Sequence, residues 1–91
     1  MNEKIRLNIK QVFDLAFQNQ SKKNYDLAKK LYQKVIEIDP NILNAQFNLA
    51  IVYEKLNEIE NAIKCYESAI KCHKILQRCC TMLYFIYKNA I

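Results

Sequence analysis

The sequence contains no glycine and only one proline, Pro40, among its 91 residues. Glycine and proline are the residues that most often interrupt regular structure, so their scarcity favours helix nearly throughout the chain. The composition, with 52% hydrophobic and 25% charged residues, is that of a folded domain. We therefore expect a single all-α domain over residues 1–91, with no β-strand.

Residues that commonly carry out catalysis are also scarce. His73 is the single histidine, and the serines are Ser21 and Ser68. Because glycine is absent, the chain contains neither a glycine-rich phosphate-binding loop nor the glycine-flanked turn that presents a nucleophilic serine. We therefore predict a protein that is not an enzyme and that needs no cofactor.

Long hydrophobic runs are missing as well. The most apolar stretch, residues 79–87, is interrupted by Thr81, whereas a helix that crosses a bilayer needs roughly 20 residues. The start of the chain has no apolar core of the length that a secretory signal needs, and Glu3 is unusual in a transit peptide. We therefore expect an intracellular, cytoplasmic protein without a membrane span.

The four cysteines and the histidine raise the question of a zinc site, because zinc prefers thiolate and imidazole ligands. Cys65 and Cys72 lie about 10 Å apart in axial rise on one expected helix, whereas the ligands of one tetrahedral ion converge to within about 4 Å. No two cysteines have the CxxC spacing of a compact chelate. The spacing therefore favours reduced cysteines that pack as small hydrophobic side chains, and it predicts no metal site.

Small and apolar residues recur along the chain at a spacing of 34 residues. The matching pairs are Leu15 and Leu49, Ala16 and Ala50, Ala28 and Ala62, Tyr32 and Tyr66, and Ile36 and Ile70. Leu83 and Tyr87 begin a third copy. This period, with small and aromatic residues at fixed positions and Pro40 closing the first unit, resembles the tetratricopeptide repeat. The resemblance implies a right-handed superhelical solenoid of antiparallel helix pairs with about five helices.

We expect one repeat at about residues 9–42, a second at about 43–76, and a partial third repeat or capping helix at 77–91. Apolar residues at spacings of three and four predict helices over residues 3–20, 25–38, 41–57, 59–72, and from 75 or 76 to 89. The first helix should bury Ile5, Ile9, Val12, Leu15 and Ala16. In the turn at 21–24, where the family usually has a glycine, we expect Asn24 to tolerate a left-handed conformation best.

A second apolar stripe accompanies the core stripe of the first helix. Phe13 and Phe17 lie about 110 to 150° round the helix from the centre of the core face. In the repeat family these positions line a concave groove that receives a peptide or a helix. The resemblance carries this role onto Phe13, Phe17, Phe47, Ile51 and Phe85, with Lys10, Asn48 and Arg78 as polar neighbours. The alternative is that several of these rings only pack between the first helices of adjacent repeats.

An apolar floor with basic edges suits an amphipathic segment that bears some acidic residues. We therefore predict a protein–protein adaptor, or a scaffold subunit of a larger assembly. The net charge of +5 leaves an RNA-binding helical-hairpin array as the alternative function. The apolar groove stripe argues against nucleic acid, because base-edge recognition needs polar side chains.

The last expected helix is apolar on nearly every side. Tyr84 stands at the position that holds Ala16 and Ala50 in the preceding copies, so a following helix cannot approach as closely there. Contiguous exposed apolar residues mark an interface or an aggregation site. We therefore predict an assembly surface at Tyr84 and Ile86, which a second copy in a homodimer or a partner chain would cover.

Overall fold

The structure, a computed structural model, describes residues 2–72 and 77–90; side chains are described for residues 8–70, 82–86 and 88–89. These residues form five helices and no strand. The helices are α1 (Asn2–Ser21), α2 (Tyr25–Ile38), α3 (Leu43–Lys55), α4 (Ile59–Cys72) and α5 (Gln77–Ala90). The all-α prediction is confirmed, and the predicted bounds of α2 and α4 agree with those observed.

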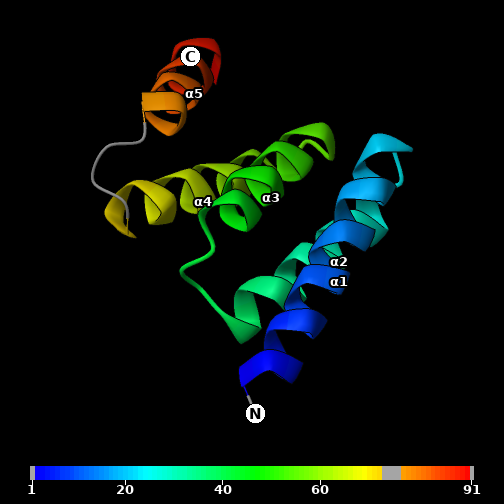
Figure 1. Ribbon diagram of the computed structural model, residues 1–91. Coiled ribbons are helices and arrows are strands. Elements are labelled where there is room, and N and C mark those ends of the chain that lie inside the picture. Colours follow the sequence, from blue (N-terminus) through cyan, green and yellow to red (C-terminus); the bar gives the residue numbers. More distant parts are fainter. Residues whose placement is uncertain (1, 73–76, 91) are drawn as a thin grey trace.

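The helices form two antiparallel hairpins, α1 with α2 and α3 with α4, followed by α5 (Figure 1). Helix α2 also packs on α3 and α4 packs on α5, so each helix contacts the next along the chain. The α1–α2 hairpin and α5 lie on opposite sides of the α3–α4 hairpin in an elongated molecule that measures 46 × 30 × 16 Å. This arrangement is the right-handed superhelical solenoid that the repeat predicted.

Two equivalent turns connect the helices of the hairpins. The Asn24 backbone N–H donates to the Asn19 carbonyl over 2.8 Å in the first turn, and the Glu58 N–H donates to the Tyr53 carbonyl over 2.8 Å in the second. This bond belongs to a motif that requires a left-handed residue just before its donor. Lys23, with φ 66°, and Asn57, with φ 62°, occupy that place. The expectation that Asn24 is left-handed was therefore wrong, since its φ is −84°.

The link between the hairpins explains why α3 begins at Leu43 rather than at residue 41. Asp39 has extended backbone angles (φ −143°, ψ 99°), as expected for a residue before proline. Its carboxylate Oδ1 accepts a 3.0 Å hydrogen bond from the Asn41 backbone N–H, which holds Asn41 in the turn. The C-terminal end of α3 is two residues shorter than predicted because Asn57 is left-handed.

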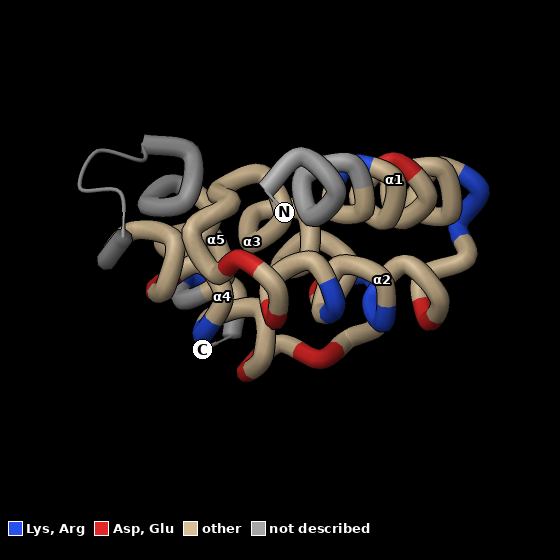
Figure 2. Tube along the Cα trace, turned by 60° about the horizontal axis from the view of Figure 1, so that its bottom comes forward, with Lys and Arg blue, Asp and Glu red and all other residues tan. Residues whose placement is uncertain are grey.

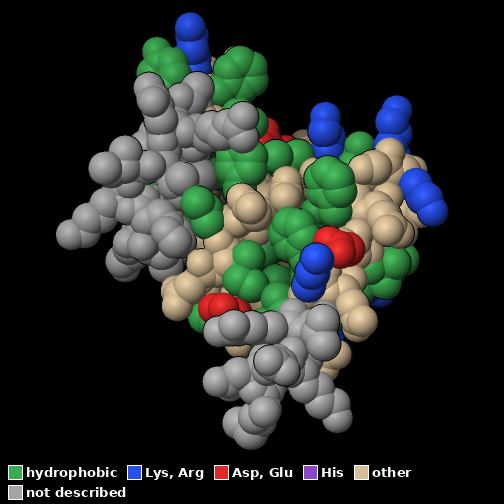
Figure 3. Space-filling model, in the orientation of Figure 1, with side chains coloured by type: hydrophobic (Ala, Val, Ile, Leu, Met, Phe, Trp, Pro, Cys, Tyr) green, Lys and Arg blue, Asp and Glu red, His purple; other side chains and the backbone are tan. Residues whose placement is uncertain are grey.

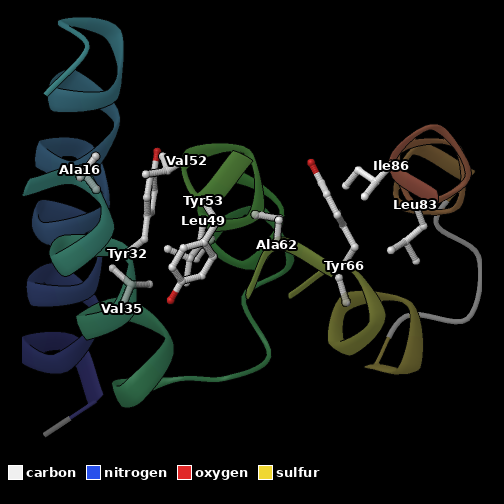
Figure 4. Close-up of a cluster of buried hydrophobic side chains, with 14 residues drawn as sticks. Ala16, Tyr32, Val35, Leu49, Val52, Tyr53, Ala62, Tyr66, Leu83 and Ile86 are labelled. Carbon is white, nitrogen blue, oxygen red and sulfur yellow. The ribbon is translucent and has the colours of Figure 1, made fainter. Parts of the chain in front are cut away.

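One continuous core runs between the helices, and Figure 4 shows Tyr32, Leu49, Val52, Ala62 and Tyr66 distributed along it. Ala28 and Ala62 are fully buried, which agrees with the close helix contact predicted for them. Leu15 was predicted to be buried but is 47% exposed. Leu49 and Leu83, its equivalents, are buried because α2 and α4 precede their helices, whereas α1 is the first helix described. None of the described helices is long and apolar enough to span a membrane.

Candidate functional site

The apolar residues predicted to line the groove, here called the groove stripe, form two rows with different surroundings. They are Phe13, Phe17, Phe47, Ile51 and Phe85. Phe13 and Phe47 are partly buried and pack against the core. Phe13 meets the Tyr32 ring edge-on, with the ring centroids 5.6 Å apart, and Phe47 meets Tyr66 in the same way at 5.7 Å. Such edge-on pairs stabilise a fold beyond their buried area. Each of these phenylalanines therefore helps to hold its own hairpin together, whereas the alternative expected from the sequence was packing between the first helices of adjacent repeats.

The second row remains accessible. Phe17 in α1 is 52% exposed, Phe85 in α5 is 60% exposed, and Ile51 between them in α3 is partly exposed. Figure 3 shows hydrophobic side chains gathered between α1 and α3 on the face toward the viewer, with most lysine and arginine side chains nearer its edge. We call Phe17, Ile51 and Phe85 the groove row.

A hollow of about 190 Å³ lies where α3, α4 and α5 meet. Phe85 forms part of its wall together with Glu54, Ile59, Ile86 and Asn89. Glu54, which lines this hollow together with Phe85, follows Ile51 by about one turn of α3. Its lining is mostly apolar, with the Glu54 carboxylate and the Asn89 amide as polar groups.

The predicted polar neighbours of the groove differ in their exposure. Lys10 is exposed on α1, and Asn48 is partly exposed on α3. Arg78 falls within α5, but its side chain lies outside the described residues, as does that of Thr81. Figure 2 shows basic and acidic residues of the described chain interspersed along the helices, without one continuous basic stripe.

Sequence reasoning missed a polar contact that recurs in both hairpins. The Tyr32 hydroxyl donates to Gln20 Oε1 over 2.6 Å, and the Tyr66 hydroxyl donates to Glu54 Oε2 over 2.5 Å. Burial raises the pKa of Tyr32 to about 12, so its hydroxyl remains a donor at neutral pH. A signal was present in the sequence, because each acceptor lies the same distance before its tyrosine.

Helix α5 exposes one of the two residues predicted for the assembly surface and buries the other. Tyr84 is 67% exposed, whereas Ile86 is only 6% exposed and belongs to the core. Figure 4 shows Leu83 and Ile86 pointing from α5 toward the side on which Tyr66 of α4 lies. Ile86 is equivalent to Val52, which is fully buried against the preceding hairpin. The prediction that Ile86 is part of an exposed assembly surface was therefore wrong, and Phe85 stands exposed beside Tyr84 instead.

A second hollow, of about 350 Å³, lies at the seam between the hairpins, where Ile36 and Pro40 face Leu49 and Cys65. Gln46 also lines it, and its side-chain Nε2 donates to the Pro40 carbonyl, while its buried Oε1 has no partner. Burial raises the pKa of the Cys65 thiol to about 11 and keeps it protonated. Among the described residues no group of histidine, cysteine, aspartate or glutamate side chains is placed to hold a metal ion. The side chains of Cys72, His73, Cys79 and Cys80 lie outside that description.

Taken together, these helices form a solenoid of helical hairpins with an accessible apolar row along one side. The model of the tetratricopeptide repeat family matches residues 8–74, which is most of the chain. The chain therefore belongs to the tetratricopeptide repeat family. Tetratricopeptide repeats generally mediate protein–protein interaction and scaffolding.

Relatives and solved structures agree with this assignment. The chain is 38% identical over 53 residues to a TPR repeat-containing protein of Methanocaldococcus jannaschii, a match that covers 58% of this chain and 17% of that protein. A crystal structure of MamA superimposes with a TM-score of 0.87 at 21% identity, over 90% of this chain and 48% of MamA. A tetratricopeptide repeat domain protein from Salinibacter ruber gives a TM-score of 0.69 at 22% identity, over 89% of each chain.

At these identities the two structural likenesses show the fold alone. The chain spans about half the length of the MamA structure and less than a fifth of the Methanocaldococcus protein. The partner and the role of this chain must therefore be argued from its own surface.

Proposed function

We propose that this chain is a protein–protein interaction module, an adaptor or a scaffold subunit of a larger assembly, that binds an amphipathic peptide or helix in the groove formed by α1, α3 and α5. The observation that carries this proposal is the groove row. Phe17, Ile51 and Phe85 occupy the same repeat position on α1, α3 and α5, and all three remain at least partly accessible. Exposed apolar side chains in such a series are typical of binding surfaces, and aromatic anchors commonly supply much of the binding free energy.

The partly buried rings beneath the row support the same proposal. Phe13 and Phe47 are fixed by edge-on contacts with Tyr32 and Tyr66. A partner would therefore meet an apolar floor that is already ordered, and little conformational entropy would be lost at the floor on binding. Lys10 and Asn48 would lie at the edges of the bound segment, so acidic or hydrogen-bonding residues on its flanks are favoured.

Two variants with similar chemistry on different helices test the proposal. Phe17→Ser with Phe85→Ser removes both exposed rings of the groove row, whereas Leu27→Ser removes an exposed apolar side chain, 46% accessible, from α2. Proteins captured by the wild-type chain would be identified by mass spectrometry, and the affinity of each purified partner segment would then be measured by calorimetry. We expect the groove variant to lose at least 2 kcal/mol of binding free energy and Leu27→Ser to bind like the wild type.

Circular dichroism would check that both variants keep the helical content of the wild type. Unchanged affinity in the groove variant would contradict the proposal. The RNA-binding alternative is tested with a single-stranded RNA over a range of salt concentrations. An affinity that falls steeply with salt and depends on the basic residues would favour that alternative, because phosphate contacts release counterions.

A further inference from the structure

One face of helix α5 is exposed to solvent. The equivalent faces of α1 and α3 are covered by the helix that follows each of them, α2 and α4. Ala16 and Ala50 lie on this face of α1 and α3, and both are fully buried in their hairpins. Tyr84 is their equivalent in α5 and is 67% exposed. The two hairpins of the same chain therefore show what fits this face, namely an antiparallel helix.

The hydrogen bonds of the two hairpins specify which chemistry the covering helix needs. In each hairpin a tyrosine hydroxyl of the second helix donates to an acceptor on the first, from Tyr32 to Gln20 and from Tyr66 to Glu54. The equivalent of Gln20 and Glu54 in α5 is Lys88, which is exposed. An ammonium group has only donors, so a tyrosine hydroxyl could only accept from it, and a charged acceptor would form a stronger hydrogen bond. A carboxylate on the covering helix would accept from Lys88.

Tyr84 changes the packing requirement of the same face. Its ring stands where Ala16 and Ala50 permit close helix approach, one helical turn before Lys88. A helix that docks here must present a small side chain opposite the ring, or lie further from α5 and cover the ring with apolar side chains. In both cases the tyrosine ring supplies apolar contact area next to the lysine charge.

We infer that the Tyr84 and Lys88 face of α5 docks an acidic amphipathic helix of a partner protein. Its apolar side packs on Tyr84, and its carboxylate pairs with Lys88. The net charge of +5 favours this occupant, since an acidic chain is attracted to the protein whereas a second copy is repelled. This surface shares no residue with the groove row, which it adjoins on α5, and Lys88→Glu removes no ring of that row, so the two proposals can fail separately.

The chain itself supplies a template for the probe. A peptide of residues Ile59–Cys72 has the shape of the helix that covers α3, and Tyr66→Glu gives it the carboxylate that Lys88 requires. A lactam bridge between Glu60 and Lys64, both exposed in α4, would hold this short peptide helical. Serine would replace both cysteines. The matched probes are the same stapled peptide with Tyr66 retained and with Tyr66→Lys.

Fluorescence anisotropy with the full chain would then measure each affinity. We expect the Tyr66→Glu peptide to bind at least tenfold more tightly than the Tyr66 peptide. Lys88→Glu should abolish this preference and should bind the Tyr66→Lys peptide instead, because the charges of the pair are exchanged. Lys55→Glu, which makes the same charge change on an exposed residue of α3, should leave the preference intact.

Equal affinities for the Glu and Tyr peptides would overturn the inference. So would an equal loss in Lys55→Glu and Lys88→Glu, because that result would mean a general charge effect. Sedimentation of the wild-type chain provides a further test. A dimer that Tyr84→Lys dissociates would place a second copy on this face and would also overturn the inference. Binding of the Tyr66→Lys peptide by Lys88→Glu would show that this variant is folded.

Discussion

The first and second hairpins have the same turns and similar tyrosine contacts. They differ on the side of the first helix that packs on the preceding hairpin in α3 but has no preceding helix described in α1. Leu15 is 47% exposed, whereas its equivalent Leu49 is 4% exposed. The residues that flank them differ as well, because Gln11 and Gln18 of α1 are exposed where α3 has buried Ala45 and Val52. Burial of a repeat position is therefore set by the neighbouring repeat as well as by the hairpin itself.

The largest difference in stability between the two hairpins should appear when Leu15 and Leu49 are each truncated to alanine. We expect Leu49→Ala to lower the free energy of unfolding by about 2 to 5 kcal/mol, because it leaves a cavity in the core. Leu15→Ala removes the same atoms from a half-exposed site and should cost much less. Urea unfolding, followed by circular dichroism, measures both. Equal losses would mean that something covers Leu15 in solution.

The next effect tests the close contact within the second hairpin. Ala62 is fully buried between α3 and α4, so Ala62→Leu should lower the free energy of unfolding by about 1 to 3 kcal/mol through overpacking. Lys30→Ala changes an exposed residue of α2 and serves as the control. Thermal melts compare the two variants. If Ala62→Leu melts with the wild type, the helices do not approach closely at this alanine.

A smaller effect on the free energy of unfolding should distinguish the turn at Lys23 from the turn at Asn57. Lys23 has a side chain that disfavours a left-handed backbone, whereas Asn57 tolerates it better. We expect Lys23→Gly to raise the free energy of unfolding by about 0.5 to 1 kcal/mol, after the greater freedom of glycine in the unfolded chain is subtracted. Asn57→Gly should gain less. Urea unfolding of the two variants measures this difference, and a loss of stability in Lys23→Gly would show that its side chain makes a contact worth more than the strain.

The smallest effect concerns the ion pair that joins the two hairpins. Lys29 Nζ lies 3.0 Å from Glu58 Oε2. The hydrogen bond from Lys29 is the main cause that lowers the pKa of Glu58 below 4.5, assisted by Asn61 and opposed by desolvation. A lowered pKa in the folded state contributes stability above the unfolded value, and this contribution is lost as the pH falls through the folded value.

The pKa of Lys29 is raised above 10.5, mainly by its hydrogen bond to Glu58, so its contribution is present below that value and is lost as the pH rises through the folded value. We expect Glu58→Gln to flatten the fall of stability below about pH 4.5 slightly, and more at low salt than at high salt. Urea unfolding from pH 3 to 7 measures the slope, and Glu60→Gln is the exposed control. An identical slope in Glu58→Gln and the wild type would exclude this contribution.

Much of the fold could be predicted from the sequence because local signals agreed. The repeated alanines and tyrosines identified the hairpins, and the bounds of α2 and the start of α4 were predicted correctly because Asp39, Pro40 and the turn residues mark where helices end and begin. The positions of the groove stripe followed from the family pattern. The family pattern did not predict that Phe13 and Phe47 are partly buried while the groove row is accessible. Phe13 and Phe47 pack against Tyr32 and Tyr66 of the next helix, and such contacts cannot be read from one helix alone.

The amino-acid sequence was enough to predict that this protein is a chain of helical hairpins, since helical periodicity and turn preference act over a few neighbouring residues. The exposure of individual apolar residues could not be predicted in this way, because it depends on how the helices pack. Leu15 and Leu49 have the same place in the repeat, and Ile86 and Phe85 are adjacent, yet in each pair one side chain is buried and the other is not. The physical reason is that water is excluded from a side chain by the helices that pack on it, and those helices come from distant parts of the sequence.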